Sequence, residues 1–221
     1  MTTELLPITE RTQVHRLRDR QVRDRAMLDQ ILDTGLVAHV ALCVGGEPVV
    51  LPVAYARDGD RLLLHGSTGA GLLRAVANGA PIAVAVTHVD GLVFATSLFD
   101  SSMNYRSAVI FGTATVLDGD ERLRALRALS DHLLPGRWDE VRPPTARELA
   151  ATLVLALPLD VVSVKVRTGG PAESTVDPSI WAGVLPVGVR TGEPVPATGL
   201  SPGIAPPASI RAAQQRHSAT S

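Results

Sequence analysis

The chain has 221 residues, and its 22 acidic and 21 basic side chains leave a formal net charge of −1. Such a balance lacks the basic surface that attracts nucleic acids or anionic membranes, so we expect neither as a partner. The sequence contains one cysteine and no secretory signal, which predicts a cytoplasmic protein without an intramolecular disulfide. No cluster of Cys or His has the spacing of metal ligands, so we expect no metal site.

The first half of the chain predicts an N-terminal arm, one helix and a series of strands. Residues 1–21 are polar and rich in arginine, and we expect them to form the arm. Apolar side chains recur on one face of residues 22–33, and Gly35 can end this helix. Strand-like runs follow at 36–44, 48–56 and 61–65. The pairs Gly45-Gly46 and Asp58-Gly59 between them are typical of hairpin turns.

The second half repeats this pattern of strands and short helices. We expect a short helix over 72–77 and two strands, 81–88 and 92–97, joined by a turn at Asp90-Gly91. Residues 99–107 look irregular, and the next elements are a strand over 108–117 and a helix after Asp118. Thr145 and Glu148 form a capping-box pattern that opens another helix. Two final strands are expected at 153–157 and 161–167.

Strands joined by short turns, with helices inserted between them, predict a mainly β protein built as an antiparallel barrel with peripheral helices. We expect one domain over residues 22–185. Residues 186–221 are rich in proline and glycine, and we expect them to wrap around the domain and to end in about a dozen disordered residues.

The most informative segment is the glycine-rich run at residues 65–71, between a strand and a helix. Its glycines and hydroxyls suit the binding of a phosphate, and Arg74 one turn later can add charge. A flexible turn is the alternative. The glycine spacing differs from a dinucleotide fingerprint, and His65 replaces the first glycine of a nucleophile elbow, so Ser67 is not expected to be acylated.

A second polar run lies at residues 101–107. It places an amide, a phenol, a guanidinium and a hydroxyl in consecutive positions: Asn104, Tyr105, Arg106 and Ser107. The planar guanidinium of Arg106 suits a bidentate phosphate contact. The alternative is that Arg106 pairs with a carboxylate across an interface.

Three histidines, His39, His65 and His88, fall on three different strands. Each is either a packed, hydrogen-bonded ring or a ligand. Lys165 and Arg167 alternate along the last strand, so they share one face, which is either a solvated edge or the wall of a cofactor cleft.

Several blocks in order, among them PVVLPVAY, RLLLHGSTG, SMNYRSAVIFG and VSVKVRTG, resemble the pyridoxamine 5′-phosphate oxidase-like family of FMN-binding split-barrel proteins. The branch that includes the nitroimidazole-resistance (Nim) type proteins is the most similar. The resemblance covers about residues 20–190. It implies a six-stranded antiparallel split barrel of Greek-key type and a homodimer with flavin at the subunit interface.

The resemblance also implies which residues bind the cofactor. One set matches the strand along the flavin ring: Val49, Leu51, Pro52 and Val53. A second set matches the phosphate loop: His65, Gly66, Ser67, Thr68 and Arg74. The third set matches the second cofactor block and its neighbours: Ser102, Asn104, Tyr105, Arg106, Ser107, Lys165, Arg167 and Trp181.

These observations predict an FMN-dependent oxidoreductase in which the flavin carries the electrons and a nicotinamide, NAD(P)H, can serve as donor to a small-molecule substrate. No catalytic residue is expected from the sequence. One alternative is a haem-binding protein with His65 or His39 as axial ligand. Another is a non-catalytic module that binds a different cofactor, such as a deazaflavin.

Overall fold

The computed structural model describes residues 4–172 and 177–218. Its strands are β1 (Gln21–Val22), β2 (Val37–Val44), β3 (Glu47–Asp58), β4 (Arg61–Ser67), β5 (Ile82–Phe94), β6 (Ser102–Gly112), β7 (Thr115–Val116), β8 (Thr152–Pro158), β9 (Val162–Arg167) and β10 (Gly183–Pro186). Its helices are α1 (Arg25–Thr34), α2 (Gly71–Ala77), α3 (Gly119–Leu133), α4 (Ala146–Ala151) and α5 (Ala208–Ser218), with 3-10 turns η1 (Arg18–Arg20) and η2 (Arg137–Asp139).

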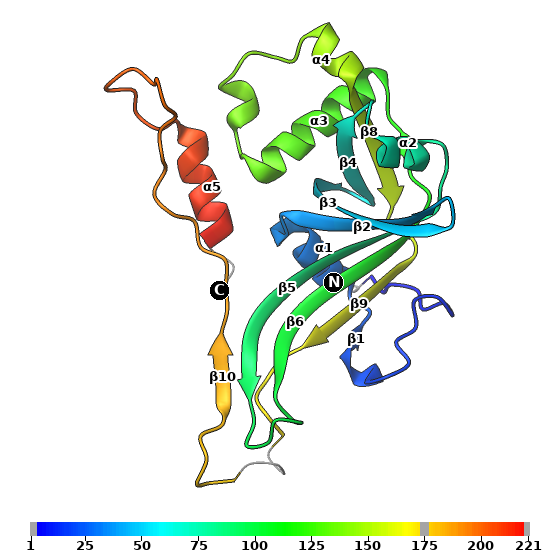
Figure 1. Cartoon of the computed structure of the whole chain (residues 1–221), viewed down its shortest axis with the longest axis vertical. Coiled ribbons are helices and arrows are strands. Elements are labelled where there is room, and N and C mark those ends of the chain that lie inside the picture. Colours follow the sequence, from blue (N-terminus) through cyan, green and yellow to red (C-terminus); the bar gives the residue numbers. More distant parts are fainter. Residues whose placement is uncertain (1–3, 173–176, 219–221) are drawn as a thin grey trace.

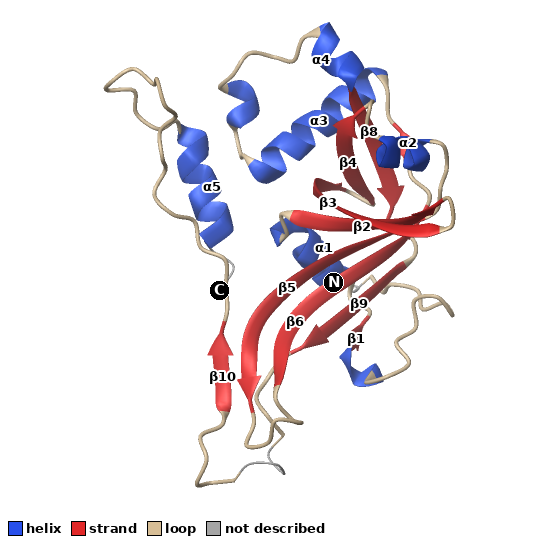
Figure 2. Cartoon of the chain, viewed as in Figure 1, coloured by secondary structure: helices blue, strands red, loops and turns tan. Residues whose placement is uncertain are grey.

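The strands of this described part form one sheet in the order β1-β9-β6-β5-β2-β3-β4-β8-β7, and β10 pairs with β5. Neighbouring strands are antiparallel, and the sheet does not close on itself. In Figure 1 the long, curved β5 and β6 run towards one end of the molecule, while α2, α3 and α4 gather near β4 and β8. Figure 2 shows the same division between a strand-rich end and a helix-rich end. The expected antiparallel split-barrel fold with peripheral helices is confirmed, although the sheet has ten strands instead of six.

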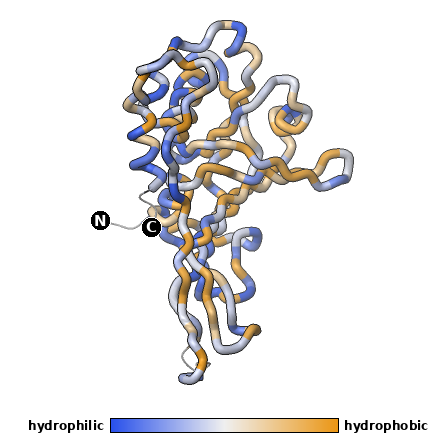
Figure 3. The backbone as a smooth tube through the Cα atoms, turned by 60° about the vertical axis from the view of Figure 1, so that its left-hand side comes forward, coloured by the Kyte–Doolittle hydropathy of each residue, from blue (hydrophilic) through white to orange (hydrophobic). Residues whose placement is uncertain are grey.

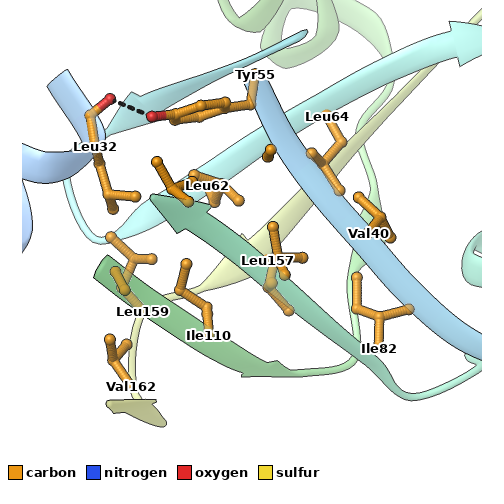
Figure 4. Packing of buried hydrophobic residues seen from close by; sticks show 14 of the residues in the cluster. Leu32, Val40, Tyr55, Leu62, Leu64, Ile82, Ile110, Leu157, Leu159 and Val162 are labelled. Atoms are coloured by element: carbon orange, nitrogen blue, oxygen red, sulfur yellow. Dashed lines mark hydrogen bonds between the residues drawn. The ribbon is translucent and has the colours of Figure 1, made fainter. Parts of the chain in front are cut away.

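The main core lies inside the curved sheet and is closed by α1. Leu28, Ile31 and Leu32 of α1 are fully buried among apolar side chains of β2, β4, β5, β6 and β8. Figure 4 shows part of this cluster, in which the hydroxyl of Tyr55 donates to the carbonyl oxygen of Leu32 at 2.8 Å. This hydrogen bond satisfies the one polar atom of the buried ring.

A second, smaller core explains why β4 is apolar on both faces. Helix α3 packs Ala125 and Leu129 against Leu63, Val154 and other residues of the outer face of β3, β4 and β8. Side chains alternate between the faces of a strand, so the consecutive buried residues of β4 need a cover on each side. Helix α3 provides the cover on the outer face.

Local sequence signals set several element boundaries as expected. The side chain of Asp24 accepts a hydrogen bond from the backbone N–H of Ala26 at the start of α1, and Gly35 ends this helix. Gly45 and Gly46 have φ values of 59° and 86°, the left-handed conformation that a tight hairpin needs. The capping box of Thr145 and Glu148 is present at the start of α4.

Two expected boundaries are wrong. Asp90-Gly91 is not a turn: β5 continues through a β-bulge between Val89 and Gly91, because residues 91–93 pair with β6 and residues 91–94 pair with β10. The chain turns later, where the hydroxyl of Ser97 donates to Asp100 at 2.6 Å. Residues 102–107, expected to be irregular, belong to strand β6.

The two ends of the chain are also more ordered than expected. Leu6 of the N-terminal arm is 6% exposed and belongs to the main core. Residues 208–218, most of which fall in the last dozen residues expected to be disordered, form helix α5. This helix docks because the Arg216 guanidinium donates to the carbonyl oxygens of Asp131 and Asp33, and the Ser209 hydroxyl donates to Glu140.

None of the helices in the described part of the chain is long and apolar enough to span a membrane.

Candidate functional site

A pocket of about 490 Å³ lies beside the end of β4, under α3 and α4. Its volume is within the range of about 300–1,000 Å³ that is typical of ligand and cofactor sites. The surface of the pocket is mainly apolar. Its apolar lining residues are Leu126, Trp138, Val141, Pro144 and Leu149, and its polar ones are His65, Ser130, Arg142, Glu148 and Thr152. An apolar pocket with one imidazole suits a largely hydrophobic ligand that needs one nitrogen donor.

His65 is the unusual residue of this pocket. Its Nδ1 atom is buried and lacks a hydrogen-bond partner, and no other side-chain nitrogen or oxygen in residues 4–172 and 177–218 shares this state. Burial lowers the pKa of His65, so the ring is neutral at pH 7. A neutral imidazole with an unused nitrogen is the form that binds a metal centre. The strand holds the ring in place, because His65 pairs with Val154 of β8.

Two charged residues that line the His65 pocket, Arg142 and Glu148, form an ion pair with each other. The Arg142 guanidinium donates to both carboxylate oxygens of Glu148 at 2.8 and 2.6 Å. Glu148 also accepts from the backbone N–H of Thr145, and these contacts lower the pKa of Glu148 to about 2. The pair therefore remains ionised at neutral pH and fixes α4 as one wall of the pocket.

The predicted phosphate loop uses most of its own hydrogen-bonding groups. The Ser67 hydroxyl accepts from the backbone N–H of Gly69 at 3.1 Å, and the N–H of Thr68 donates to Ala151 at 3.0 Å. A Cβ on Gly66 would lie 2.2 Å from Leu73 Cδ1. The packing of α2 therefore accounts for this glycine without a ligand, which differs from the role expected.

Two positions near the loop remain open to a ligand. A Cβ on Gly71 would meet nothing within 4 Å, so no steric need of the described chain requires glycine there. Arg74 is exposed on α2. Its guanidinium has no carboxylate partner among the described residues, and it is the guanidinium nearest in sequence to the loop.

The strand expected to lie along a flavin ring has a free backbone edge. Residues 47–54 of β3 pair with β2 on one side, while β4 pairs only with residues 55–58 on the other. Val49 and Pro52 are exposed there, and Leu51 and Val53 are half-buried. In Figure 3 the β2–β3 hairpin projects from the molecule as a mainly apolar segment with a hydrophilic tip. A planar ring with polar edges fits such a strand, because unpaired N–H and C=O groups can bond it.

The second polar block is satisfied within the protein. Arg106 donates from Nε and Nη2 to both carboxylate oxygens of Asp90 at 3.0 and 2.8 Å. This bidentate pair lies within one chain, whereas the alternative drawn from the sequence was a pair across an interface, and it occupies the guanidinium expected to bind phosphate. The Ser107 hydroxyl donates to the carbonyl oxygen of Lys165 at 3.2 Å.

The remaining predicted residues of this region follow the same pattern. Asn104 is 8% exposed, donates to the carbonyl oxygen of Gly169 at 3.1 Å and accepts from Arg167. Tyr105 and Lys165 are half-buried, and Ser102 is exposed. Trp181 is 70% exposed and makes an edge-to-face contact with Phe94 at 5.9 Å, at the far end of β5.

One chain therefore does not bring the predicted residues into one site. Strands β3 and β4, which carry the first two sets, are separated in the sheet from β6 and β9 by β2 and β5. Sequence reasoning also missed the walls of the His65 pocket, such as Leu126 and Trp138. The apolar face of α3 was the available signal, but the sequence does not show which strand this face covers.

A separate cleft of about 410 Å³ lies between the end of α1, β2, β5 and the C-terminal segment. His39, His88 and Arg106 line one side, and Val187, Val189 and His217 line the other. His88 Nε2 lies 3.0 Å from the carbonyl oxygen of Ile31, so this ring is a hydrogen-bonded histidine. No group of three or more His, Cys, Asp or Glu residues in the described ranges has the arrangement of a metal site.

Comparison with known proteins identifies the family. Residues 24–166 match the sequence profile of the pyridoxamine 5′-phosphate oxidase family. The chain belongs to this family. No curated protein matches it.

Among solved structures of the pyridoxamine 5′-phosphate oxidase family and its relatives, the FAD and haem binding protein from Mycobacterium smegmatis is 45% identical. The match covers 88% of this chain and 97% of that chain, with a TM-score of 0.85. The flavocytochrome Anf3 from Azotobacter vinelandii is 34% identical over 92% of this chain and 96% of its own, with a TM-score of 0.86.

A putative 5-nitroimidazole antibiotic resistance protein from Bacteroides thetaiotaomicron shares the fold at 19% identity. The match covers 66% of this chain and 86% of that chain, with a TM-score of 0.57. The family resemblance drawn from the sequence blocks is confirmed.

Proposed function

We propose that this chain is a redox protein that binds both a flavin and a haem, with His65 as the protein ligand of the haem iron. The observation that carries the haem site is that His65 lines a mainly apolar pocket while its buried Nδ1 atom has no hydrogen-bond partner. The two relatives above support the pair of cofactors, because one is named for FAD and haem and the other is a flavocytochrome.

The residues present fit a haem in three respects. The pocket volume is about 490 Å³, and apolar side chains such as Leu126, Trp138 and Leu149 supply the surface that a porphyrin needs. The His65 ring is neutral and can donate an electron pair. An unsatisfied buried nitrogen normally costs about 1–3 kcal/mol, and a bond to a metal would remove this cost.

The flavin is proposed to lie against the free edge of β3 and to extend towards the loop that follows β4. Residues 49–53 supply unpaired backbone groups beside exposed apolar side chains. Thr68, the open position at Gly71 and the exposed guanidinium of Arg74 suit the phosphate end. The name of the relative from Mycobacterium smegmatis favours FAD, whereas the resemblance drawn from the sequence implies FMN. Chromatography of the flavin released by acid separates the two.

A homodimer is part of the proposal. Exposed apolar side chains gather on β2 and β3 and on the far end of β5, β6 and β10: Val37, Val44, Val49, Val50, Val89, Leu92, Phe94, Met103 and Leu185. Exposed apolar side chains gathered in this way are typical of interaction sites. A second copy would cover the free edge of β3 and could bring the β6 block of one protomer to the flavin of the other. Light scattering should give twice the chain mass at micromolar concentration, and a monomer would contradict the shared site.

Bound flavin exchanges electrons in pairs or singly and haem iron exchanges them singly, so together they supply electron transfer between two-electron and one-electron partners. The chain's own residues bind, orient and shield these groups. His65 would hold the iron, the apolar wall of α3 and α4 would exclude water, and β3 would orient the flavin ring.

The decisive experiment compares His65→Ala with His39→Ala, because both histidines are candidate ligands and only His65 lines the 490 Å³ pocket. Purified wild-type protein supplied with haem and flavin should show a Soret band beside flavin absorption near ~450 nm. His65→Ala should lose the Soret band, with a fall in haem affinity of at least about 100-fold, and should keep its flavin. His39→Ala should retain both. A Soret band of full strength in His65→Ala would overturn the assignment.

A further inference from the structure

The C-terminal segment from β10 to α5, residues 183–218, forms an arm along one side of the molecule (Figure 1). Its first part is held by strand pairing between β10 and β5, and the backbone N–H of Val187 donates to the carbonyl oxygen of Asp90 at 3.1 Å. Val187, Gly188, Val189 and His217 of the arm line the 410 Å³ cleft opposite His39 and Arg106. Removing the arm would therefore open this cleft.

The far end of the arm is fastened at His132 of α3, a residue that is 5% exposed. His132 Nε2 lies 2.7 Å from the carbonyl oxygen of Gly35, and His132 Nδ1 lies 3.3 Å from Nη2 of Arg216. A carbonyl oxygen can only accept and a guanidinium can only donate. The ring must therefore carry its proton on Nε2 and leave Nδ1 as an acceptor, which is a neutral imidazole.

A second proton on His132 would be incompatible with this contact. It would place an N–H on Nδ1 against the N–H of Arg216, and it would put two positive charges at about hydrogen-bond distance. Arg216 also donates to the carbonyl oxygens of Asp131 and Asp33 at 3.2 and 3.3 Å, so it is the residue that joins α5 to both α3 and α1. Repulsion at His132 therefore acts on the main attachment of the helix.

We propose that the arm is a lid over the 410 Å³ cleft and that protonation of His132 releases it. The other groups around His132 are few. The Tyr55 ring of β3 lies with its centroid 5.3 Å from that of His132, and burial raises the pKa of Tyr55 well above its ordinary value, so Tyr55 stays neutral. Asp33 of α1 and Asp131 of α3 pair with Arg57 and Arg127. His217 of α5 lies 3.3 Å from the carbonyl oxygen of Leu133.

The direction of the pH effect follows from the environment of the ring. Burial lowers the pKa of His132, and the Arg216 charge lowers it further, against the opposing hydrogen bond to Gly35 and the charge of Asp33. When the arm leaves, Arg216 departs and water reaches the ring, so the pKa rises towards its ordinary value near 6.5. Docking is then complete above about pH 6.5 and weakens as the pH falls below it, by up to about tenfold per pH unit for one proton.

Hydrogen–deuterium exchange of the full-length protein tests this inference, with rates corrected for the intrinsic effect of pH. Protection of α5 and of residues 183–190 should fall together between pH 7.5 and 5.5, while β4 stays protected. In His132→Gln this pH dependence should vanish, because the amide can still donate to Gly35 but does not titrate in this range. His217→Gln should keep the dependence.

Arg216→Gln and Arg211→Gln form a matched pair on the same helix, because Arg211 is exposed and makes no hydrogen bond or ion pair to the described residues of α1 or α3. Arg216→Gln should reduce protection of α5 at pH 7.5 at least tenfold, and Arg211→Gln should not. This pair decides the role of Arg216 even where His132→Gln fails to fold.

The proposal is wrong if wild-type α5 is equally protected at both pH values or if His132→Gln retains the pH dependence. It is also wrong if the two arginine variants behave alike, or if α5 is released while residues 183–190 stay protected. The measurement needs no cofactor, so its outcome is independent of the haem and flavin assignments.

Discussion

The His65 pocket and the Arg106 region look alike in the sequence, since each combines a polar run with the end of a strand, but the structure treats them in opposite ways. Around Arg106 the polar groups bond one another: Asp90 accepts from Nε and Nη2 of Arg106, and the amide oxygen of Asn104 accepts from Arg167. At His65 a buried nitrogen is left without a partner. Satisfied polar groups stabilise a fold, whereas a buried unsatisfied group is the stronger indicator of a missing ligand.

The largest effect on stability is expected for Arg106→Ala. Loss of the half-buried pair with Asp90 should lower the free energy of unfolding by about 1.5–3 kcal/mol, because Asp90 is left without its charged partner. Denaturant unfolding measures this loss. Arg137→Ala is the control, because its pair with Glu140 is exposed and is worth about 0–1 kcal/mol. If Arg106→Ala instead keeps its stability and loses flavin affinity, the contrast between the Arg106 region and the His65 pocket is wrong, and Arg106 belongs to the cofactor site.

Two of the three glycines of the loop, Gly66 and Gly71, should respond differently to a methyl group. Gly66→Ala should lower the free energy of unfolding by about 1–3 kcal/mol, because the new Cβ would lie 2.2 Å from Leu73 Cδ1. Gly71→Ala meets nothing within 4 Å and should leave stability equal or higher. Flavin titration of Gly71→Ala then shows whether the cofactor comes close to this position, since a fall in affinity without a loss of stability can only arise from the ligand.

The pH dependence of haem binding should follow the protonation of His65. Burial lowers the pKa of His65, so the ring is neutral from pH 8 down past its ordinary value of about 6.5. Haem affinity should therefore be constant over that range and fall only at lower pH, by up to about tenfold per pH unit. Spectroscopic titrations at several pH values test this. A fall that begins above pH 7 would contradict a neutral buried ligand.

The smallest expected effect is a gain in the stability of the cofactor-free protein. His65→Leu in the cofactor-free protein should keep or raise the free energy of unfolding by about 1 kcal/mol, because an apolar side chain of similar size removes the unsatisfied nitrogen. Thermal unfolding of the apo forms measures this difference. A loss of 2 kcal/mol or more would mean that His65 supports the fold.

Sequence reasoning succeeded where the determinants are local. The hairpin at Gly45-Gly46, the cap of α1 and the capping box of α4 depend on residues within a few positions of each other. It failed at Asp90-Gly91 because β5 continues there between two partners, β6 and β10, and β10 lies about ninety residues later. Helix α5 was missed for the same reason, since its attachments are to α1 and α3.

The candidate site was predictable in part. The sequence singled out His65 and named it as a possible haem ligand, because its strand and loop were recognisable. It could not show that Arg106 faces Asp90, since the register between β5 and β6 decides this contact. The apolar walls from α3 and α4 also depend on packing between segments that are more than sixty residues from His65.

The attachment of Arg216 to Asp33 joins residues that are 183 positions apart in the chain. Bringing these two residues together lowers the conformational entropy of the chain before the new contacts can offset that loss. Contacts between residues far apart in the sequence therefore form slowly. During synthesis the sheet up to β9 can assemble while the last fifty residues are still being added. The strand β10 and helix α5 must then arrive on a surface that already exists. Until they do, the edge of β5 at residues 91–94 and the cleft beside it are uncovered. The nascent chain therefore passes through a stage in which it is prone to associate with other chains.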